Sequence, residues 1–239
     1  MISEQNLKQI TQKYQTDEGT VLREYFQHLF LSYFYQHADT DRIYFKGGTA
    51  LRLIYRSPRF SEDIDFSAGL TNVDPIERAV IDALSAISKE GVVTDIEEAT
   101  PTTGGYLAEL NLTAYGRTIP IRLEVSLRAG KKAGTLATIV NDFVPDYTVL
   151  QLDEPQLIGE KITALLTRKK PRDFYDFYFL LRRNMIQNKN RETFEAVLKV
   201  LKETKIRFDS ELRAVLPKSH HMIIRDFRAT LEREIKKYL

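Results

Sequence analysis

Residues 118–127 alternate strictly between apolar and polar side chains, and this alternation limits most strongly how the chain can fold. The apolar positions are Ile119, Ile121, Leu123, Val125 and Leu127. The polar positions on the other side are Arg122, Glu124, Ser126 and Arg128. Because successive side chains of a strand point to opposite faces, the segment predicts a strand with one buried and one polar face. A second strand over 106–114 and a turn at Gly116-Arg117 complete an antiparallel hairpin.

Helical periodicity dominates most of the remaining chain. It predicts helices over 17–38, 49–55, 74–91, 156–168, 172–183, 191–203 and 219–238. In the helix after residue 73, Asp74 is expected as the N-cap, Pro75 as the first helical residue and Glu77 as the partner in a capping box. Short strands are expected over 43–45 and 63–66. The pattern therefore indicates an α+β protein with a mixed sheet, flanking helices and a helical C-terminal region.

Composition excludes several classes of protein. The chain has 239 residues and no cysteine, so disulfides, thiolate metal sites and cysteine nucleophiles are excluded. The N-terminal stretch 1–13 is polar, unlike a signal peptide, and no apolar run approaches the roughly 18 residues that span a bilayer. We therefore expect a soluble, cytoplasmic protein with no membrane partner. The four histidines show no metal-ligand spacing.

Charge is distributed unevenly along the chain. Residues 1–154 contain 15 Lys and Arg against 22 Asp and Glu, a net charge of −7, and residues 155–239 contain 20 against 11, a net charge of +9. An acidic half beside a basic half suits a metal site next to a surface that binds a polyanion. A lysine-rich helical region that only aids solubility is the other interpretation. The change in charge and pattern predicts a domain boundary that separates residues 1–154 from residues 155–239.

A Gly-Gly pair follows the expected strand at 43–45. Glycines let the backbone approach a phosphate closely, and the start of the next helix offers free N–H groups. The residues concerned are Lys46, Gly47, Gly48 and Thr49. A simple turn is the other interpretation of such a pair.

Asp63 and Asp65 lie two residues apart in a strand-like segment, so both carboxylates are expected on one face. Two neighbouring carboxylates repel unless a cation or proton lies between them, and oxygen-only ligands suit Mg²⁺. Glu124, on the polar face of its strand, is the candidate third carboxylate. Alternatively, 63–65 is a solvated acidic turn and Glu124 an edge-strand residue paired with Arg122 or Arg128.

The order of these elements resembles the polymerase-β-like nucleotidyltransferase superfamily. In that pattern Gly-Gly after a strand precedes an Asp-x-Asp strand, and a later strand carries one more carboxylate. The resemblance implies metal binding by Asp63, Asp65 and Glu124. Three such groups can hold two Mg²⁺ ions, with Mn²⁺ as a substitute. Glu124 would bind the second metal or act as the base.

The longer segments 46–51 and 59–66 resemble the AbiEii/AbiGii toxin family of nucleotidyltransferases. Downstream matches are Glu160, Lys161, Ala164, Leu165, Arg168 and the run Arg172-Asp173-Phe174-Tyr175-Asp176. The resemblance covers about residues 43–181.

It implies an essential lysine and an essential aspartate in the downstream block, and the spacing favours Lys161 and Asp176 over Asp173. Lys161 and Arg168 share a helix face and are expected to bind the triphosphate. Ser61 is expected to help bind the nucleotide.

The implied reaction is transfer of a nucleoside monophosphate from an NTP to an acceptor hydroxyl, plausibly the 3′ end of tRNA. Residues 1–154 would form the nucleotidyltransferase domain, and residues 155–239 would form a helical region that closes its active-site cleft. The resemblance also implies toxin activity and a cognate antitoxin, often a winged-helix repressor. Two alternatives remain: an acceptor that is a small molecule or a protein side chain, and a nucleotide-binding module without catalysis.

Overall fold

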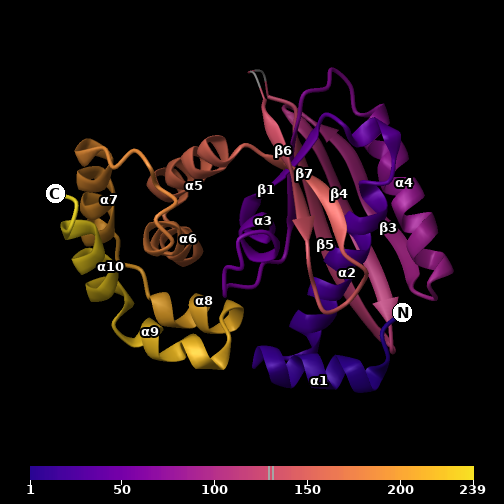
Figure 1. Ribbon diagram of the computed structural model, residues 1–239, viewed down its shortest axis with the longest axis horizontal. Coiled ribbons are helices and arrows are strands. Elements are labelled where there is room, and N and C mark those ends of the chain that lie inside the picture. The colour runs from indigo at the N-terminus through magenta and orange to yellow at the C-terminus, as the bar shows by residue number, and fades with distance from the viewer. Residues whose placement is uncertain (129, 131) are drawn as a thin grey trace. The chain divides into compact units, whose positions relative to one another are not determined.

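The computed structural model describes residues 1–128, 130 and 132–239, and Figure 1 shows the course of the chain. Within the described residues the strands form a seven-stranded mixed sheet in the order β3-β4-β5-β2-β1-β7-β6. The strands are β1 Ile43–Lys46, β2 Ile64–Ala68, β3 Val93–Thr102, β4 Gly105–Ala114, β5 Arg117–Ser126, β6 Gly134–Ile139 and β7 Tyr147–Leu152. Helices accompany this sheet, so the predicted α+β class is confirmed.

The helices before the last strand are α1 Glu4–Tyr14, α2 Glu18–Phe34, α3 Gly47–Leu53 and α4 Asp74–Lys89. The later helices are α5 Glu154–Arg168, α6 Pro171–Arg182, α7 Arg191–Glu203, α8 Phe208–Val215, α9 His221–Arg225 and α10 Phe227–Lys236. Single 3₁₀ turns lie at Ala38–Thr40 and Lys218–His220. No helix of the described chain is long and apolar enough to cross a membrane.

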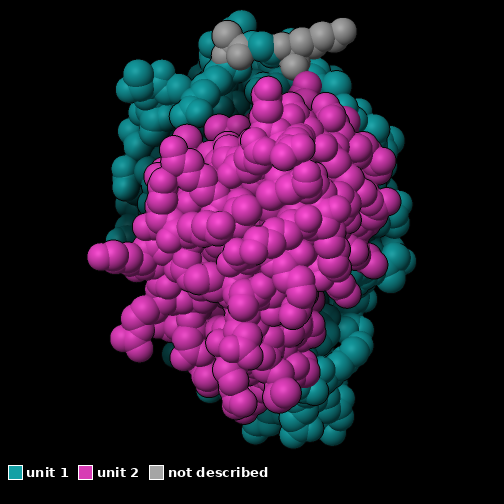
Figure 2. Space-filling view, turned by 90° about the vertical axis from the view of Figure 1, so that its left-hand side faces the viewer, with its two compact units in different colours: residues 1–56, 60–153 teal, residues 57–59, 154–239 magenta. Residues whose placement is uncertain are grey.

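Two compact units make up the structure (Figure 2). The first contains Met1–Arg56 and Phe60–Asp153, and the second contains Glu154–Leu239 together with Ser57–Arg59. The short segment Ser57–Arg59 thus belongs with the helices although it precedes most of the sheet in sequence.

The first unit is built on the hairpin of β4 and β5. Tyr115 and Gly116 both have positive φ, 54° and 69°, which is the geometry of a two-residue turn that matches the twist of the strands. The turn therefore lies one residue earlier than predicted, and Arg117 already pairs with Ala114 in the ladder. Beyond the hairpin, β2 runs parallel to β5, and β1 runs antiparallel to β2.

One face of the sheet is covered by α2 and α4, which contact each other and the strands (Figure 1). The rings of Phe34 on α2 and Phe66 on β2 stack with centroids 5.0 Å apart, and both side chains are fully buried. Burial of such rings stabilises the fold by roughly 1.5–3 kcal/mol each. The opposite face of β2 and β5 carries the polar side chains.

The second unit packs its helices around aromatic rings. Phe208 forms edge contacts with Phe174 of α6 at 5.4 Å and with Phe227 of α10 at 5.1 Å between ring centroids. Phe177 and Phe194 bring α6 against α7 in the same way, at 5.9 Å. The aromatic and leucine side chains of 174–181 therefore contribute to the core of this unit.

Several boundaries differ from the sequence prediction. Asp74 is the first residue of α4 rather than its N-cap, because Val73 holds the cap position and makes no side-chain capping bond. Gly47 and Gly48 begin α3 directly and form no separate loop. The helix expected over 219–238 is divided, since Asp226 leaves helical geometry with φ −119° and ψ 31°.

Candidate active site

Lys46, Asp65 and Glu124 form one row across three neighbouring strands. Asp65 on β2 is the Cα partner of Lys46 on β1 and of Glu124 on β5. Directly paired residues of a sheet point to the same face, and neighbouring strands lie about 4.8 Å apart. The fold therefore places two of the predicted carboxylates and one predicted cation side by side, on the face opposite Phe66.

Gly47 lies against the carboxylate of Asp65. A Cβ atom at position 47 would lie 2.0 Å from Asp65 Oδ2 and 2.7 Å from its Cβ and Cγ. The φ of Gly47 is +82°, a conformation that side chains other than glycine rarely adopt. The glycine is thus required by both the backbone and the neighbouring aspartate, which is a more specific function than the close approach to phosphate predicted from the sequence.

Two buried polar side chains hold the segment that leads into β2. Thr49 is fully buried, and its hydroxyl donates a hydrogen bond to the backbone carbonyl of Asp63. Gln27 on α2 is also buried and donates to the carbonyls of Ser61 and Glu62, at 3.0 Å each. The Thr49 side chain, which was predicted to contact phosphate, therefore binds the backbone beside Asp63.

Asp63 itself lies just before β2, which begins at Ile64. Like Asp65 it is half-buried, and the backbone contact with Thr49 fixes its position in the chain. Asp63 therefore lies near the row because it is only two residues before Asp65 in the chain. Glu124 joins the row because β5 pairs with β2.

Arg122 and Glu124 form an ion pair on the polar face of β5. Arg122 Nε donates to Glu124 Oε1 at 2.7 Å, and Arg122 Nη1 lies 3.6 Å from Oε1 of Glu109 on β4. The Arg122 and Glu124 side chains are 46 % and 51 % exposed. The pairing with Arg122 agrees with the alternative prediction, but β5 lies between β4 and β2 and is not an edge strand. Glu124 also lies beside Asp65.

Oxygen donors of this kind suit a hard cation such as Mg²⁺. The register that places Asp65 beside Glu124 fits such an ion. Across residues 1–128, 130 and 132–239, however, no three His, Cys, Asp or Glu side chains are gathered into a group that could hold a metal as they stand. The predicted set of Asp63, Asp65 and Glu124 would therefore require a rotation of side chains, and Glu124 is held by Arg122.

In the second unit, Asp176 lies between two cations. Its Oδ1 accepts from Arg59 Nε at 2.8 Å, and its Oδ2 accepts from Arg59 Nη2 at 3.0 Å and from Lys161 Nζ at 2.8 Å. All three side chains are buried. Burial alone would raise the pKa of Asp176, but the charges of Arg59 and Lys161 outweigh it and lower that pKa to about 2.

Arg59 is the residue of this group that the sequence did not assign. It stands in the segment that resembles the toxin family, but its partner Asp176 is 117 positions away. Two hydrogen bonds from one guanidinium group to the two oxygens of a carboxylate are the geometry that arginine favours. The sequence therefore showed Arg59 as a residue of the family motif, but nothing near it in the sequence indicated its partner or its function.

Asp173 has a different neighbour and a different function. Its Oδ2 accepts from the backbone N–H of Lys170, which precedes α6, and its Oδ1 accepts from Arg168 Nη2 at 2.7 Å. Asp173 is buried, whereas the Arg168 side chain is 51 % exposed. Asp173 therefore caps α6, in agreement with the structural function that the spacing favoured.

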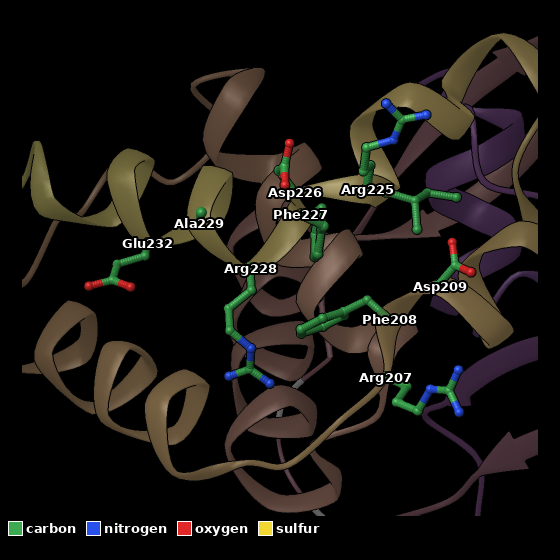
Figure 3. A pocket seen from close by; sticks show the side chains of 10 residues that line it. Arg207, Phe208, Asp209, Arg225, Asp226, Phe227, Arg228, Ala229 and Glu232 are labelled. Atoms are coloured by element: carbon green, nitrogen blue, oxygen red, sulfur yellow. The ribbon is translucent and has the colours of Figure 1, made fainter.

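A hollow of about 420 Å³ lies in the second unit, and its lining includes none of these residues of α5 and α6 (Figure 3). Its charged lining consists of Arg207, Asp209, Arg225, Asp226, Arg228 and Glu232. Three cations and three anions balance, and Arg228 donates to the carbonyls of Leu201 in α7 and of Thr204 and Ile206 after it. The hollow thus has no charge preference for a phosphate ligand.

Residues 29–237 match the AbiEii family, described as the nucleotidyl transferase AbiEii toxin of type IV toxin–antitoxin systems. The chain belongs to this family. The resemblance stated from residues 43–181 is thereby confirmed, and it extends through nearly the whole chain. This AbiEii chain is accordingly a nucleotidyltransferase toxin, and its family implies an antitoxin partner.

Two solved structures from Helicobacter pylori share the fold. JHP933 is 17 % identical, with a TM-score of 0.57 and 93 % of each chain covered. A candidate nucleotidyltransferase is 18 % identical, with a TM-score of 0.56, and the similarity covers 100 % of this chain and 99 % of that one. At this identity they establish the nucleotidyltransferase fold alone. No curated protein matches the AbiEii chain.

Proposed function

We propose that this AbiEii protein uses a divalent cation to transfer a nucleoside monophosphate from an NTP to the 3′ end of tRNA. The observation that supports the proposal most directly is the row of Asp65 and Glu124 on one sheet face, with Gly47 shaped to admit the Asp65 carboxylate. The glycine at position 47 supports the proposal because any larger residue there would displace the Asp65 carboxylate.

Asp63, Asp65 and Glu124 would hold Mg²⁺, or Mn²⁺ in its place. When bound, such ions neutralise the triphosphate and lower the pKa of the attacking hydroxyl. Lys46 and the backbone of Gly47 and Gly48 would bind the phosphates, and Ser61 would help to orient the nucleotide.

Lys161 and Arg168 would neutralise charge on the triphosphate. Lys161 is oriented by Asp176, and an ammonium group has three N–H bonds, of which one goes to that aspartate. The function proposed for Asp176 is therefore to position Lys161. Lys161→Ala should weaken NTP binding in calorimetry while leaving tRNA binding unchanged, and the reverse result would assign Lys161 to the acceptor.

A tRNA acceptor is supported by the +9 charge of residues 155–239, since neutralising phosphates with Lys and Arg dominates the affinity for nucleic acid. A small-molecule acceptor would need no such charge.

The test is incubation of the purified chain with each α-labelled NTP, Mg²⁺ and either total RNA or a panel of antibiotics. We expect label in the tRNA band, its loss with a chelator, and its loss in Asp65→Asn. Label in an antibiotic would replace the proposed acceptor, and transfer that survives both the chelator and Asp65→Asn would reject the metal site.

The toxin activity of the family predicts a second observation. Expression of the wild-type chain in a bacterial host should arrest growth, and expression of Asp65→Asn or Lys161→Ala should not. Normal growth with soluble, active wild-type protein would indicate a harmless acceptor and contradict the tRNA proposal.

A further inference from the structure

Arg122 lies between two carboxylates on the same polar sheet face. Its Nε is 2.7 Å from Glu124 Oε1, and its Nη1 is 3.6 Å from Glu109 Oε1. Glu109 on β4 is the direct Cα partner of Arg122, and Glu124 is two residues further along β5. One guanidinium group therefore contacts both carboxylates at once, Glu124 more closely and Glu109 at a longer distance.

The shorter contact engages a carboxylate beside Asp65. Any cation shared by Asp65 and Glu124 needs a Glu124 oxygen, and Arg122 is bonded to one of them. Arg122 and a divalent cation thus compete for the same carboxylate. Among the described residues, Asp63, Asp65 and Glu124 are not gathered into a metal-binding group, and the Arg122 contact holds one of the three carboxylates.

The Arg122 contact is weak enough to exchange. Both side chains are about half exposed, and ion pairs of this type shift an equilibrium by about two- to fivefold. After exchange, Arg122 keeps Glu109 as a partner, so its charge is not left alone.

We propose that Arg122 is a positioning residue that holds Glu124 when no metal is bound, releases it to a divalent cation while keeping Glu109, and so sets the affinity of the site for divalent cations. The proposal rests on the proposed function, because it assumes a metal shared by Asp65 and Glu124. It assigns to Arg122 a control of metal loading rather than a contact with the reacting atoms.

The experiment is a titration of the full chain with Mn²⁺, in which electron paramagnetic resonance measures the free ion. Arg122→Gln should bind Mn²⁺ about two- to fivefold more tightly than the wild type. Arg117→Gln is the control for losing one exposed charge from the same strand, since Arg117 is 50 % exposed, pairs with Glu18 at 2.7 Å and lies on the opposite face of β5. It should change the affinity much less.

Two double variants separate direct competition from the general field of a positive charge. In a Glu124→Gln background, Arg122→Gln should have no more effect than Arg117→Gln, because the contested carboxylate is gone. Glu109→Gln should weaken Mn²⁺ binding by leaving Arg122 to Glu124, and this effect should disappear in an Arg122→Gln background.

Unchanged or weaker Mn²⁺ binding by Arg122→Gln, or an effect equal to that of Arg117→Gln, would overturn the proposal. An effect that persists without Glu124 would overturn it as well. An unchanged Mn²⁺ affinity in Asp65→Asn would instead contradict the metal site of the proposed function. Loss of affinity in Asp65→Asn with no response to Arg122→Gln rejects the Arg122 inference alone.

Discussion

Gly47 illustrates how one residue without a side chain shapes the site. Its backbone adopts a positive φ of +82°, and the space where a Cβ would lie is filled by the carboxylate of Asp65. Gly91 provides a natural comparison, because its φ is +85° and a Cβ added there would meet no described atom within 4 Å. The two glycines share the backbone requirement, and only Gly47 has the clash.

Gly47→Ala should therefore abolish transfer, with a loss of at least about 100-fold in kcat if Asp65 is displaced by about 1 Å or more. Gly91→Ala should cost about 1–2 kcal/mol of stability for the left-handed backbone and retain full activity. Steady-state kinetics and urea unfolding of both variants check this. Equal activity loss in the two variants would show that backbone strain, and not the contact with Asp65, explains the glycine.

Asp176 is a buried carboxylate whose charge is balanced by Arg59 and Lys161. Its pKa in the fold is about 2, against a usual value of 3.8. A lowered pKa stabilises the folded state at pH values above the unfolded pKa, and this contribution is lost as the pH falls through the folded pKa. The affected window thus lies between about pH 4 and about pH 2.

Asp176→Asn should lower the stability of the helical unit by about 3–5 kcal/mol near neutral pH, because two buried cations lose their partner. The difference from wild type should stay constant down to about pH 4 and shrink below it, as the wild-type aspartate takes up a proton. Urea unfolding at a series of pH values measures this. A difference that is independent of pH down to about pH 2 would contradict the ionised state of Asp176.

At the scale of elements, the start of α6 depends on a side chain inside the helix. Lys170 holds the N-cap position, and the Asp173 carboxylate accepts from its backbone N–H and from Arg168. A carboxylate in the first turn also interacts favourably with the helix dipole. Asp173 and Asp176 are thus three residues apart but stabilise different features.

Asp173→Asn keeps the size of the side chain and removes its charge, so we expect a loss of about 1 kcal/mol, a fall of a few degrees in Tm and nearly normal transfer. Asp176→Asn should by contrast lose activity through Lys161. Calorimetry and the RNA-labelling assay on the two variants test the difference. Loss of activity in Asp173→Asn at a preserved Tm would make Asp173 the functional aspartate.

At the scale of the whole molecule, the helical unit is completed by a segment from the first quarter of the chain. Ser57–Arg59 belongs to that unit, and the Arg59 guanidinium is buried against Asp176. The chain therefore passes between the two units at 56/57 and 59/60 as well as at 153/154. The fragment 154–239 alone would contain Asp176 and Lys161 without Arg59.

Arg59→Gln in the full chain should therefore destabilise the helical unit by about 3–5 kcal/mol, although the substitution lies outside residues 154–239. Arg56→Gln is the control, since Arg56 is exposed and donates to the carbonyl of Val140 in the first unit. Hydrogen exchange of the α5 and α6 amides reports the effect in that unit. Equal protection of α6 in both variants would show that Asp176 does not depend on Arg59.

The sequence by itself determined those features that depend on local pattern. The alternation over 118–127 predicted β5, and the periodicity after Pro155 predicted α5, α6 and α7 within a few residues. The family was also recognisable from the Gly-Gly and Asp-x-Asp segments, because their chemistry requires fixed residue types at short spacing.

Elements with weak local patterns were missed. The edge strand β3 is almost entirely exposed and so shows no apolar alternation, and α1 buries only Leu7 and Ile10. The strands β6 and β7 and the short helix α8 were not predicted either. In these segments, pairing and packing with distant residues decide the structure, and propensity contributes little.

Only the tertiary structure decided which side chains meet. The parallel pairing of β2 with β5 places Glu124 beside Asp65, 59 positions away. No turn joins these two strands directly, so local spacing does not show that they pair. The same holds for Arg59 and Asp176, whose pairing depends on how the helices pack. Local sequence determines which face a side chain occupies, whereas long-range pairing determines its neighbours.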